Sequence, residues 1–137
     1  MFASLSNPHM AYAQVGMETR VAGADPHLLI LMLFDGALMS VSTASHQMEM
    51  GETAGKGLSI SRAIDIIGNG LKVSLDLDAG GELAQRLYAL YDYMCARLLH
   101  ANAHNDRAAL EEVSHLLGEL KDAWEEIRQK LSQGAPM

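Results

Sequence analysis

The sequence predicts an all-α protein: an antiparallel four-helix bundle with a short extra N-terminal helix or mobile arm. Four long segments repeat apolar residues at spacings of three and four, the pattern of helices that bury one face. Short stretches rich in Gly, Asn or Asp separate them, which favours antiparallel neighbours. The 137 residues, 49% of them hydrophobic, suffice for one domain with a core. We expect an arm over residues 1–24, a bundle over 25–131 and a disordered tail over 132–137.

Residues 1–24 are rich in Ala, Ser and Gly, and their large apolar residues are scattered. Such a composition forms at most a short helix and cannot build a core alone. Tyr12 and Val15 could dock on the bundle, and the alternative is a frayed terminus without a role. Both interpretations leave this segment outside the core.

The first long helix is predicted from Pro26 to about Met50. Asp25 is a favoured N-cap residue, and proline suits the first helical position, where no amide donor is needed. Seven apolar residues follow one another from Leu28 to Phe34. At about 100° per residue they leave no polar face on these two turns. This helix therefore lies either in the centre of the bundle or offers an outer face to a partner.

The second helix, over about residues 58–77, carries conflicting signals. Its apolar residues recur at spacings of four and three, as in an amphipathic helix. It also contains Gly68-Asn69-Gly70, and Asn-Gly is a strong hairpin signal, followed here by the alternating pattern of a strand. An isolated hairpin is barely stable in water, so the context favours a helix. We expect a loop over residues 51–57 before it and a break over residues 79–81 after it.

The last two helices have the clearest patterns. One is predicted over residues 82–101, with its apolar residues on one face. The other follows a turn over residues 102–106, where Asn105 or Asp106 provides the cap. It places apolar residues at alternating spacings of three and four up to Leu131. Acidic residues near the starts and basic residues near the ends suit the helix dipoles.

Charge and composition argue against several function classes. A net charge of -7 repels a phosphate backbone, so no nucleic-acid partner is expected. The single cysteine, Cys95, cannot form an internal disulfide, and the first fifteen residues lack the basic and apolar regions of a signal peptide. We therefore expect a cytoplasmic protein. The longest apolar run falls well short of about 18 residues, so no membrane span is predicted.

Catalytic and metal-binding patterns are weak. A ferritin-like di-iron bundle needs two Glu-x-x-His motifs, and the chain has one, from Glu112 to His115, with His115 expected to point outward. His100 and His104 have the spacing of a metal-binding pair but offer only two ligands at a helix end. We therefore predict no enzymatic activity, no cofactor and no metal. The di-iron bundle stays a remote alternative.

A series of short motifs covers nearly the whole chain past Tyr12. The motifs are PHLL at 26–29, MLFDGA at 32–37, ISRAIDII at 60–67, SLD at 74–76, GGELA at 80–84, LYDYM at 90–94, and AN at 101–102 near ND at 105–106. Their order and spacing are specific together, and they resemble the flagellin export chaperone family (FliS). The usual Leu-Tyr-Asp-Gly of the family is Leu33-Phe34-Asp35-Gly36 here, which removes a hydroxyl.

The resemblance implies the bundle fold and favours a helix at Asn69-Gly70. It also implies a cytoplasmic chaperone that binds the disordered C-terminal segment of flagellin, prevents its premature polymerisation and assists its delivery to the flagellar type III export gate. An adaptable apolar groove suits such a segment, whose ordering keeps the binding reversible. In the family the N-terminal arm packs where cargo competes, so Tyr12 and Val15 would lie over the groove.

The groove residues that we expect to contact flagellin lie on helical stripes that could equally belong to the core. Two alternatives remain open beside the chaperone. One is a regulatory adaptor or anti-sigma-type partner protein without flagellin cargo, and the other is a homodimer that buries its own apolar helix. The expected groove residues are Leu29, Met32, Leu33, Ile64, Leu71 and Leu98.

Overall fold

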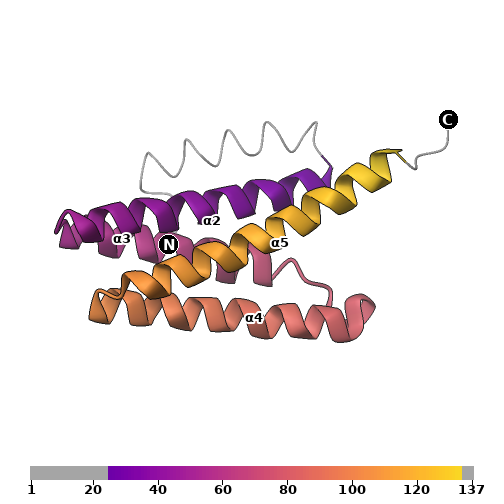
Figure 1. The fold of residues 1–137 in the computed structure, drawn as a ribbon. Coiled ribbons are helices and arrows are strands. Elements are labelled where there is room, and N and C mark those ends of the chain that lie inside the picture. The colour runs from indigo at the N-terminus through magenta and orange to yellow at the C-terminus, as the bar shows by residue number, and fades with distance from the viewer. Residues whose placement is uncertain (1–24, 134–137) are drawn as a thin grey trace, which may run out of the picture.

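The computed structural model describes residues 25–133 (Figure 1). The predicted arm, with Tyr12 and Val15, lies outside the described residues, as do residues 134–137 of the predicted tail. The prediction of an all-α fold is confirmed, since the described part of the chain is helical and contains no strand. Its elements are α2 (Pro26–Glu49), α3 (Thr53–Ile66), the π-helix η2 (Ile67–Lys72), α4 (Leu77–His104) and α5 (Arg107–Gln133).

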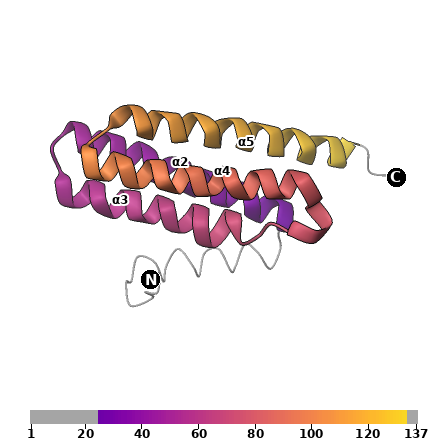
Figure 2. The ribbon, with the colours of Figure 1, turned by 90° about the horizontal axis from the view of Figure 1, so that it is seen from below.

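The helices run alternately in opposite directions and form an antiparallel bundle (Figures 1 and 2). Helices α3 and α5 each pack on both α2 and α4, which lie diagonally opposite each other. Short connections at the ends make neighbours in sequence neighbours in space. All helices contribute to one apolar core, whose largest fully buried side chains are Val41, Ile60, Ile67, Leu71, Met94, Leu98, Leu110, Val113 and Leu117.

Helix α2 begins as its sequence predicts. The side chain of Asp25 accepts a hydrogen bond from the Leu28 amide at 2.8 Å, and Pro26 occupies the first turn. By length and composition the whole of α2 could also cross a membrane, with a mean hydropathy of 1.7 over 18 residues. The prediction of no membrane span considered only the unbroken apolar run. In the structure α2 packs on α3, η2 and α5, and core helices of bundles pass the same test.

The predicted loop over residues 51–57 is too long, because α3 begins at Thr53. The turn is completed at Gly51, whose φ of +74° lies in the region that favours glycine. Gly55 and Gly57 lie inside α3. Glycine lowers helix propensity by only about 1 kcal/mol relative to alanine, which packing of the helix on its neighbours can offset.

The predicted helix over residues 58–77 ends at Lys72, and its last part is the π-helix η2. Asn69-Gly70 lies within η2, so the preference for a helix over a hairpin is confirmed. A turn at Val73 and Ser74 then ends the helix, and Ser74 Oγ donates to the Leu71 carbonyl at 2.7 Å. No strand lies in the described residues to pair with the alternating pattern, which explains why a hairpin does not form.

Helix α4 begins at Leu77, earlier than the predicted start at residue 82. Asp76 caps it by accepting hydrogen bonds from the amides of Asp78 and Ala79 at 3.1 and 2.9 Å. The predicted break corresponds to a kink within α4 at Gly81, with φ 56° and ψ -134°. This conformation is essentially restricted to glycine.

The turn between α4 and α5 uses both predicted cap residues. Asn105 ends α4 in the left-handed conformation, with φ 50°. Asp106 accepts a hydrogen bond from the Ala109 amide at 3.3 Å and so caps α5. The extent of α4 is slightly underestimated, since it continues to His104.

Candidate functional site

The six predicted groove residues do not form one surface in the structure. Leu71 and Leu98 are 1% and 0% exposed, so they are core residues and not walls of a surface groove. Their stripes face the centre of the bundle. Ile64 is half-buried and packs against the core, and its carbonyl oxygen lies 3.8 Å from Cys95 Sγ. The remaining three residues, Leu29, Met32 and Leu33, lie on one side of α2.

Leu29, Met32, Leu33 and Gly36 follow one another at helical spacing and are all half-buried. Two glycines mark where α2 approaches the end of α3 and η2. A Cβ atom on Gly36 would lie 3.4 Å from Ile66 Cδ1, and one on Gly70 would lie 3.1 Å from Leu33 Cδ2. We call this strip the α2–η2 seam, which comprises Leu29, Met32, Leu33, Gly36, Ile66 and Gly70.

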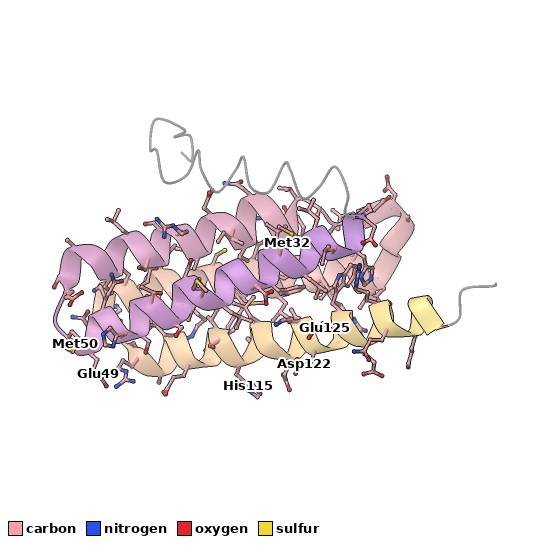
Figure 3. The ribbon with its side chains drawn as sticks, turned by 90° about the horizontal axis from the view of Figure 1, so that it is seen from above. Met32, Glu49, Met50, His115, Asp122 and Glu125 are labelled. Atoms are coloured by element: carbon pink, nitrogen blue, oxygen red, sulfur yellow. The ribbon has the colours of Figure 1, made fainter. Side chains whose placement is uncertain are left out.

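Part of the seam consists of apolar side chains that do not pack against the core of the bundle. Leu33 and Ile66 pack against the core, whereas Leu29 and Met32 are not among the described side chains that do so. Figure 3 shows Met32 on the outer side of α2. Only 33% of the most apolar 18-residue window of α2 is buried. Helix α2 therefore presents apolar side chains that a partner could cover.

The opposite side of α2 is occupied by the second half of α5. The rings of His27 and Trp124 stack with centroids 3.9 Å apart, and Trp124 Nε1 donates to the His27 carbonyl at 2.9 Å. The hydrogen bond from Arg128 lowers the pKa of Asp25. Ion pairs at 2.7 Å flank the stack, Lys121–Asp35 and Arg128–Asp25. We call these contacts the α2–α5 clasp. Because the clasp covers one side of α2, the seam is an apolar side of α2 that these contacts leave uncovered.

Several large apolar side chains are exposed outside the seam. Leu58 and Leu99 fall off the core stripes of their helices, which is the signal that could have found them. Leu83 was expected on the apolar face of the helix over residues 82–101, and that expectation is wrong, because Leu83 lies just after the kink at Gly81 and is 67% exposed. Leu99, for example, is 60% exposed although its neighbour Leu98 is fully buried. Those that are at least 60% exposed are Met39, Met50, Leu58, Val73, Leu83 and Leu99.

The single Glu-x-x-His motif does not form a metal site. Glu112 accepts hydrogen bonds from the Tyr93 hydroxyl and from Arg97 Nε, and these two partners lower its pKa. It therefore joins α5 to α4. His115 is exposed and points away from the bundle (Figure 3). Within residues 25–133, no group of three or more His, Cys, Asp or Glu is placed to hold a metal ion.

The other candidate reactive groups have local partners. His100 Nε2 lies 3.1 Å from Asp106 Oδ2, and the His100 and His104 rings are 4.5 Å apart at the end of α4. Cys95 is half-buried, and burial raises the pKa of its thiol. A raised pKa disfavours the reactive thiolate. The two histidines therefore belong to the end of α4, and Cys95 is a packing residue.

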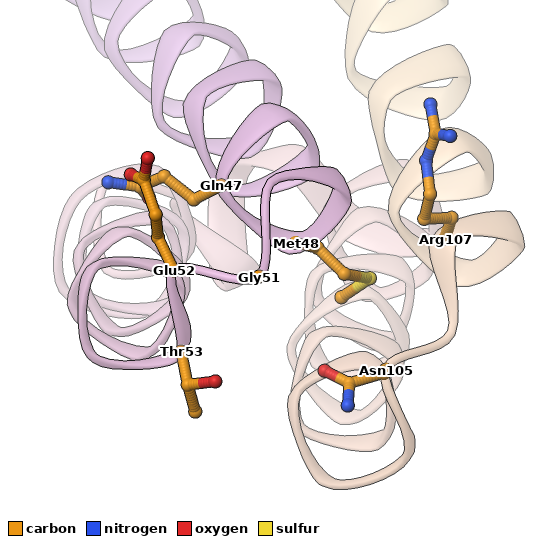
Figure 4. Close-up of a pocket in the computed structure, with 7 residues that line it drawn as sticks. All are labelled: Gln47, Met48, Gly51, Glu52, Thr53, Asn105 and Arg107. Carbon is orange, nitrogen blue, oxygen red and sulfur yellow. The ribbon is translucent and has the colours of Figure 1, made fainter.

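A cavity of about 250 Å³ lies at the far end of the bundle from the start of α2 (Figure 4). It is formed where the α2–α3 connection meets the α4–α5 turn. Arg107 is held beside it by an ion pair with Glu49 at 2.9 Å. Its lining is largely polar and includes no nucleophile paired with a base. The lining residues are Gln47, Met48, Gly51, Glu52, Thr53, Asn105 and Arg107.

The fold and the seam together define a class, that of helical-bundle binding proteins with an adaptable apolar face. The polar clusters described above join one helix to another, and they leave the apolar side chains of the seam uncovered. Comparison with known proteins narrows the class. The family model described as flagellar protein FliS matches residues 8–131, and the chain belongs to this family.

Curated relatives agree over most of the chain. The flagellar secretion chaperone FliS of Salmonella typhimurium is 51% identical over 122 residues, 89% of this chain and 90% of the relative. FliSB of Pseudomonas aeruginosa is 47% identical over 116 residues, 85% and 91% of the two chains. FliS of Bacillus subtilis is 32% identical over 126 residues, 92% and 90% of the two chains.

These matches confirm the resemblance and the predicted function class, a flagellar export chaperone. Membership of the family implies a flagellar protein as client. Chaperone is not an enzyme class, and the adaptor alternative is not favoured.

Proposed function

We propose that this chaperone binds the disordered C-terminal segment of flagellin in the cytoplasm, prevents its premature polymerisation and assists its delivery to the flagellar type III export gate. The α2–η2 seam is the observation that carries this proposal. An amphipathic segment laid along it would remove Leu29 and Met32 from water. Both side chains are already half-buried, so covering them contributes less than the roughly 1.5–3 kcal/mol of complete burial, and ordering the segment offsets part of this gain. Binding is therefore reversible.

The N-terminal arm is the proposed cover of the seam in the absence of cargo. It joins α2 at Asp25, close to Leu29, so a segment that turns back at this point runs along α2. An extended chain advances about 3.3 Å per residue against 1.5 Å in a helix, which makes the arm long enough to reach the seam. Tyr12 and Val15 are its proposed contacts, and flagellin displaces them.

Isothermal calorimetry tests the proposal. The purified chain is titrated with a peptide of about the last forty residues of flagellin, and we expect saturable 1:1 binding at micromolar concentration. Met32→Lys places a charge in the seam and should weaken binding about tenfold, equivalent to about 1.4 kcal/mol. Met50→Lys is the matched control, because Met50 is exposed at the other end of α2 (Figure 3).

The result that contradicts the proposal is an absence of heat with the unmodified chain. Light scattering of the free chain tests the homodimer alternative. A dimer that persists at all concentrations and is unaffected by the peptide would show that a second copy, and not flagellin, covers the apolar helix.

A further inference from the structure

The α2–η2 seam has its closest approach at Gly70. A Cβ atom there would lie 3.1 Å from Leu33 Cδ2 and 3.3 Å from Leu33 Cδ1. These distances are shorter than ordinary carbon–carbon contacts of about 3.5–4.0 Å, so any side chain at position 70 displaces Leu33. Hydrogen in place of a side chain lets Leu33 lie directly against the backbone of η2.

The direction of that displacement follows from the packing. Leu33 is half-buried and rests on the core. Close-packed core atoms do not yield, so a Leu33 side chain pushed by residue 70 moves toward its exposed side. That side is the part of the seam next to Leu29 and Met32. The seam then becomes shallower.

The local structure sets Gly70 apart from the other glycine in η2. A π-helix is rare and frequently occurs at functional sites, and η2 contains both Gly68 and Gly70. A Cβ atom on Gly68 would have no atom within 4 Å. A side chain at position 70 therefore has to displace Leu33, whereas a side chain at position 68 meets none of the described residues.

We propose that Gly70 is a positioning residue for cargo binding, which sets the depth of the α2–η2 seam by leaving room for Leu33. This inference rests on the proposed function, since it requires the flagellin segment to occupy the seam. Gly70 does not itself need to touch the cargo. It acts through the place that it gives to the Leu33 side chain.

Calorimetry with the flagellin C-terminal peptide tests the inference. Gly70→Ala should weaken binding about fivefold, and Gly68→Ala should leave it unchanged. Valine at position 33 lacks the Cδ atoms that would meet the new methyl group. In a Leu33→Val background, Gly70→Ala should therefore have no further effect. The thermal unfolding midpoint of Gly70→Ala should change little, because the higher helix propensity of alanine offsets the cost of displacing Leu33.

Three outcomes separate the claims. Equal affinities of the unmodified chain and Gly70→Ala overturn the inference while the proposed function stands. An equal loss in the Leu33→Val background overturns it too, because Gly70 would then act without Leu33. No binding by the unmodified chain overturns the proposed function and with it the inference.

Discussion

Lys56 shows how a single side chain joins distant parts of this bundle. It is 4% exposed, and its ammonium group donates to the Asn102 carbonyl at 3.0 Å and to Asn105 Oδ1 at 2.7 Å. Both acceptors lie at the C-terminal end of α4, where the helix dipole favours a cation. Lys56 therefore ties the start of α3 to the α4–α5 turn.

Replacing this lysine should destabilise the fold. Lys56→Met keeps an unbranched side chain but leaves the Asn102 and Asn105 oxygens without their donor, which costs about 1–3 kcal/mol. Urea unfolding followed by fluorescence of Trp124, the single tryptophan, measures the change. Arg62→Met is the control on the exposed side of α3, with an expected effect within about 0.5 kcal/mol. Equal effects of the two variants would contradict this role.

Glu112 makes the stability depend on pH. Hydrogen bonds from Tyr93 and Arg97 lower its pKa from the ordinary value of 4.5. A carboxylate whose pKa is lowered by folding stabilises the protein above the unfolded pKa, and this contribution is lost as the pH falls through the folded pKa. The thermal unfolding midpoint should therefore fall as the pH drops through and below the ordinary value of 4.5, and fall less in Glu112→Gln. Glu111→Gln is the exposed control, and identical profiles for the two variants would refute the assignment.

Residues whose roles depend on near neighbours could be predicted from the sequence, and residues whose partners are distant could not. Asp25 and Asp106 act as caps because their acceptor oxygens reach amides three residues on. Lys56 lies between two glycines and was assigned to a loop. Its role could not be predicted, because its acceptors at the end of α4 are 46 and 49 positions away in the sequence. Periodicity places Leu98 on the apolar stripe of its helix and Leu99 off it, but it could not show that this stripe faces the core and not a groove.

At the level of whole elements, the amphipathic pattern predicted that the helices exist. The glycines near the starts of two of them led to predicted starts that are too late. Helix α5 has the most regular apolar repeat and begins where Asp106 caps it. Helices α3 and α4 begin earlier than predicted, because glycines were taken as breaks. Glycine is only a weak local signal, and packing or a kink accommodates it. The excess apolar surface of α2 was visible in the sequence. That Ile66 and Gly70 lie beside it could be seen only in the folded structure.

Two glycines should respond to alanine with opposite signs. Gly81 has φ 56° and ψ -134°, so Gly81→Ala strains the backbone by about 1–3 kcal/mol although a Cβ atom there meets nothing. Gly118 lies inside α5 with open space around its Cβ position, so Gly118→Ala should stabilise by about 0.5–1 kcal/mol. Thermal unfolding of both variants checks this. Stabilisation by Gly81→Ala would show that the kink is not held in solution.

Across the whole molecule, the two sides of α2 are specialised. The α2–α5 clasp fixes one side by a ring stack, a hydrogen bond and two ion pairs. The α2–η2 seam is joined by apolar contacts, which are not directional and can be exchanged. The proposed cover of the seam, whether the N-terminal arm or the flagellin segment, could therefore dissociate without breaking the contacts of the clasp. This division of α2 is what an exchangeable partner requires.

Deleting residues 1–20 should tighten cargo binding or leave it unchanged. A tethered arm competes at a high effective concentration, and the apparent affinity of the cargo falls by the fraction of chains whose seam is open. If the arm covers the seam nine-tenths of the time, deletion strengthens binding about tenfold. Calorimetry with the flagellin peptide measures this, and the full chain carrying Tyr12→Ser and Val15→Ser should show the same direction of change. A large loss of affinity on deletion would instead mean that the arm contacts the cargo and is no competing cover.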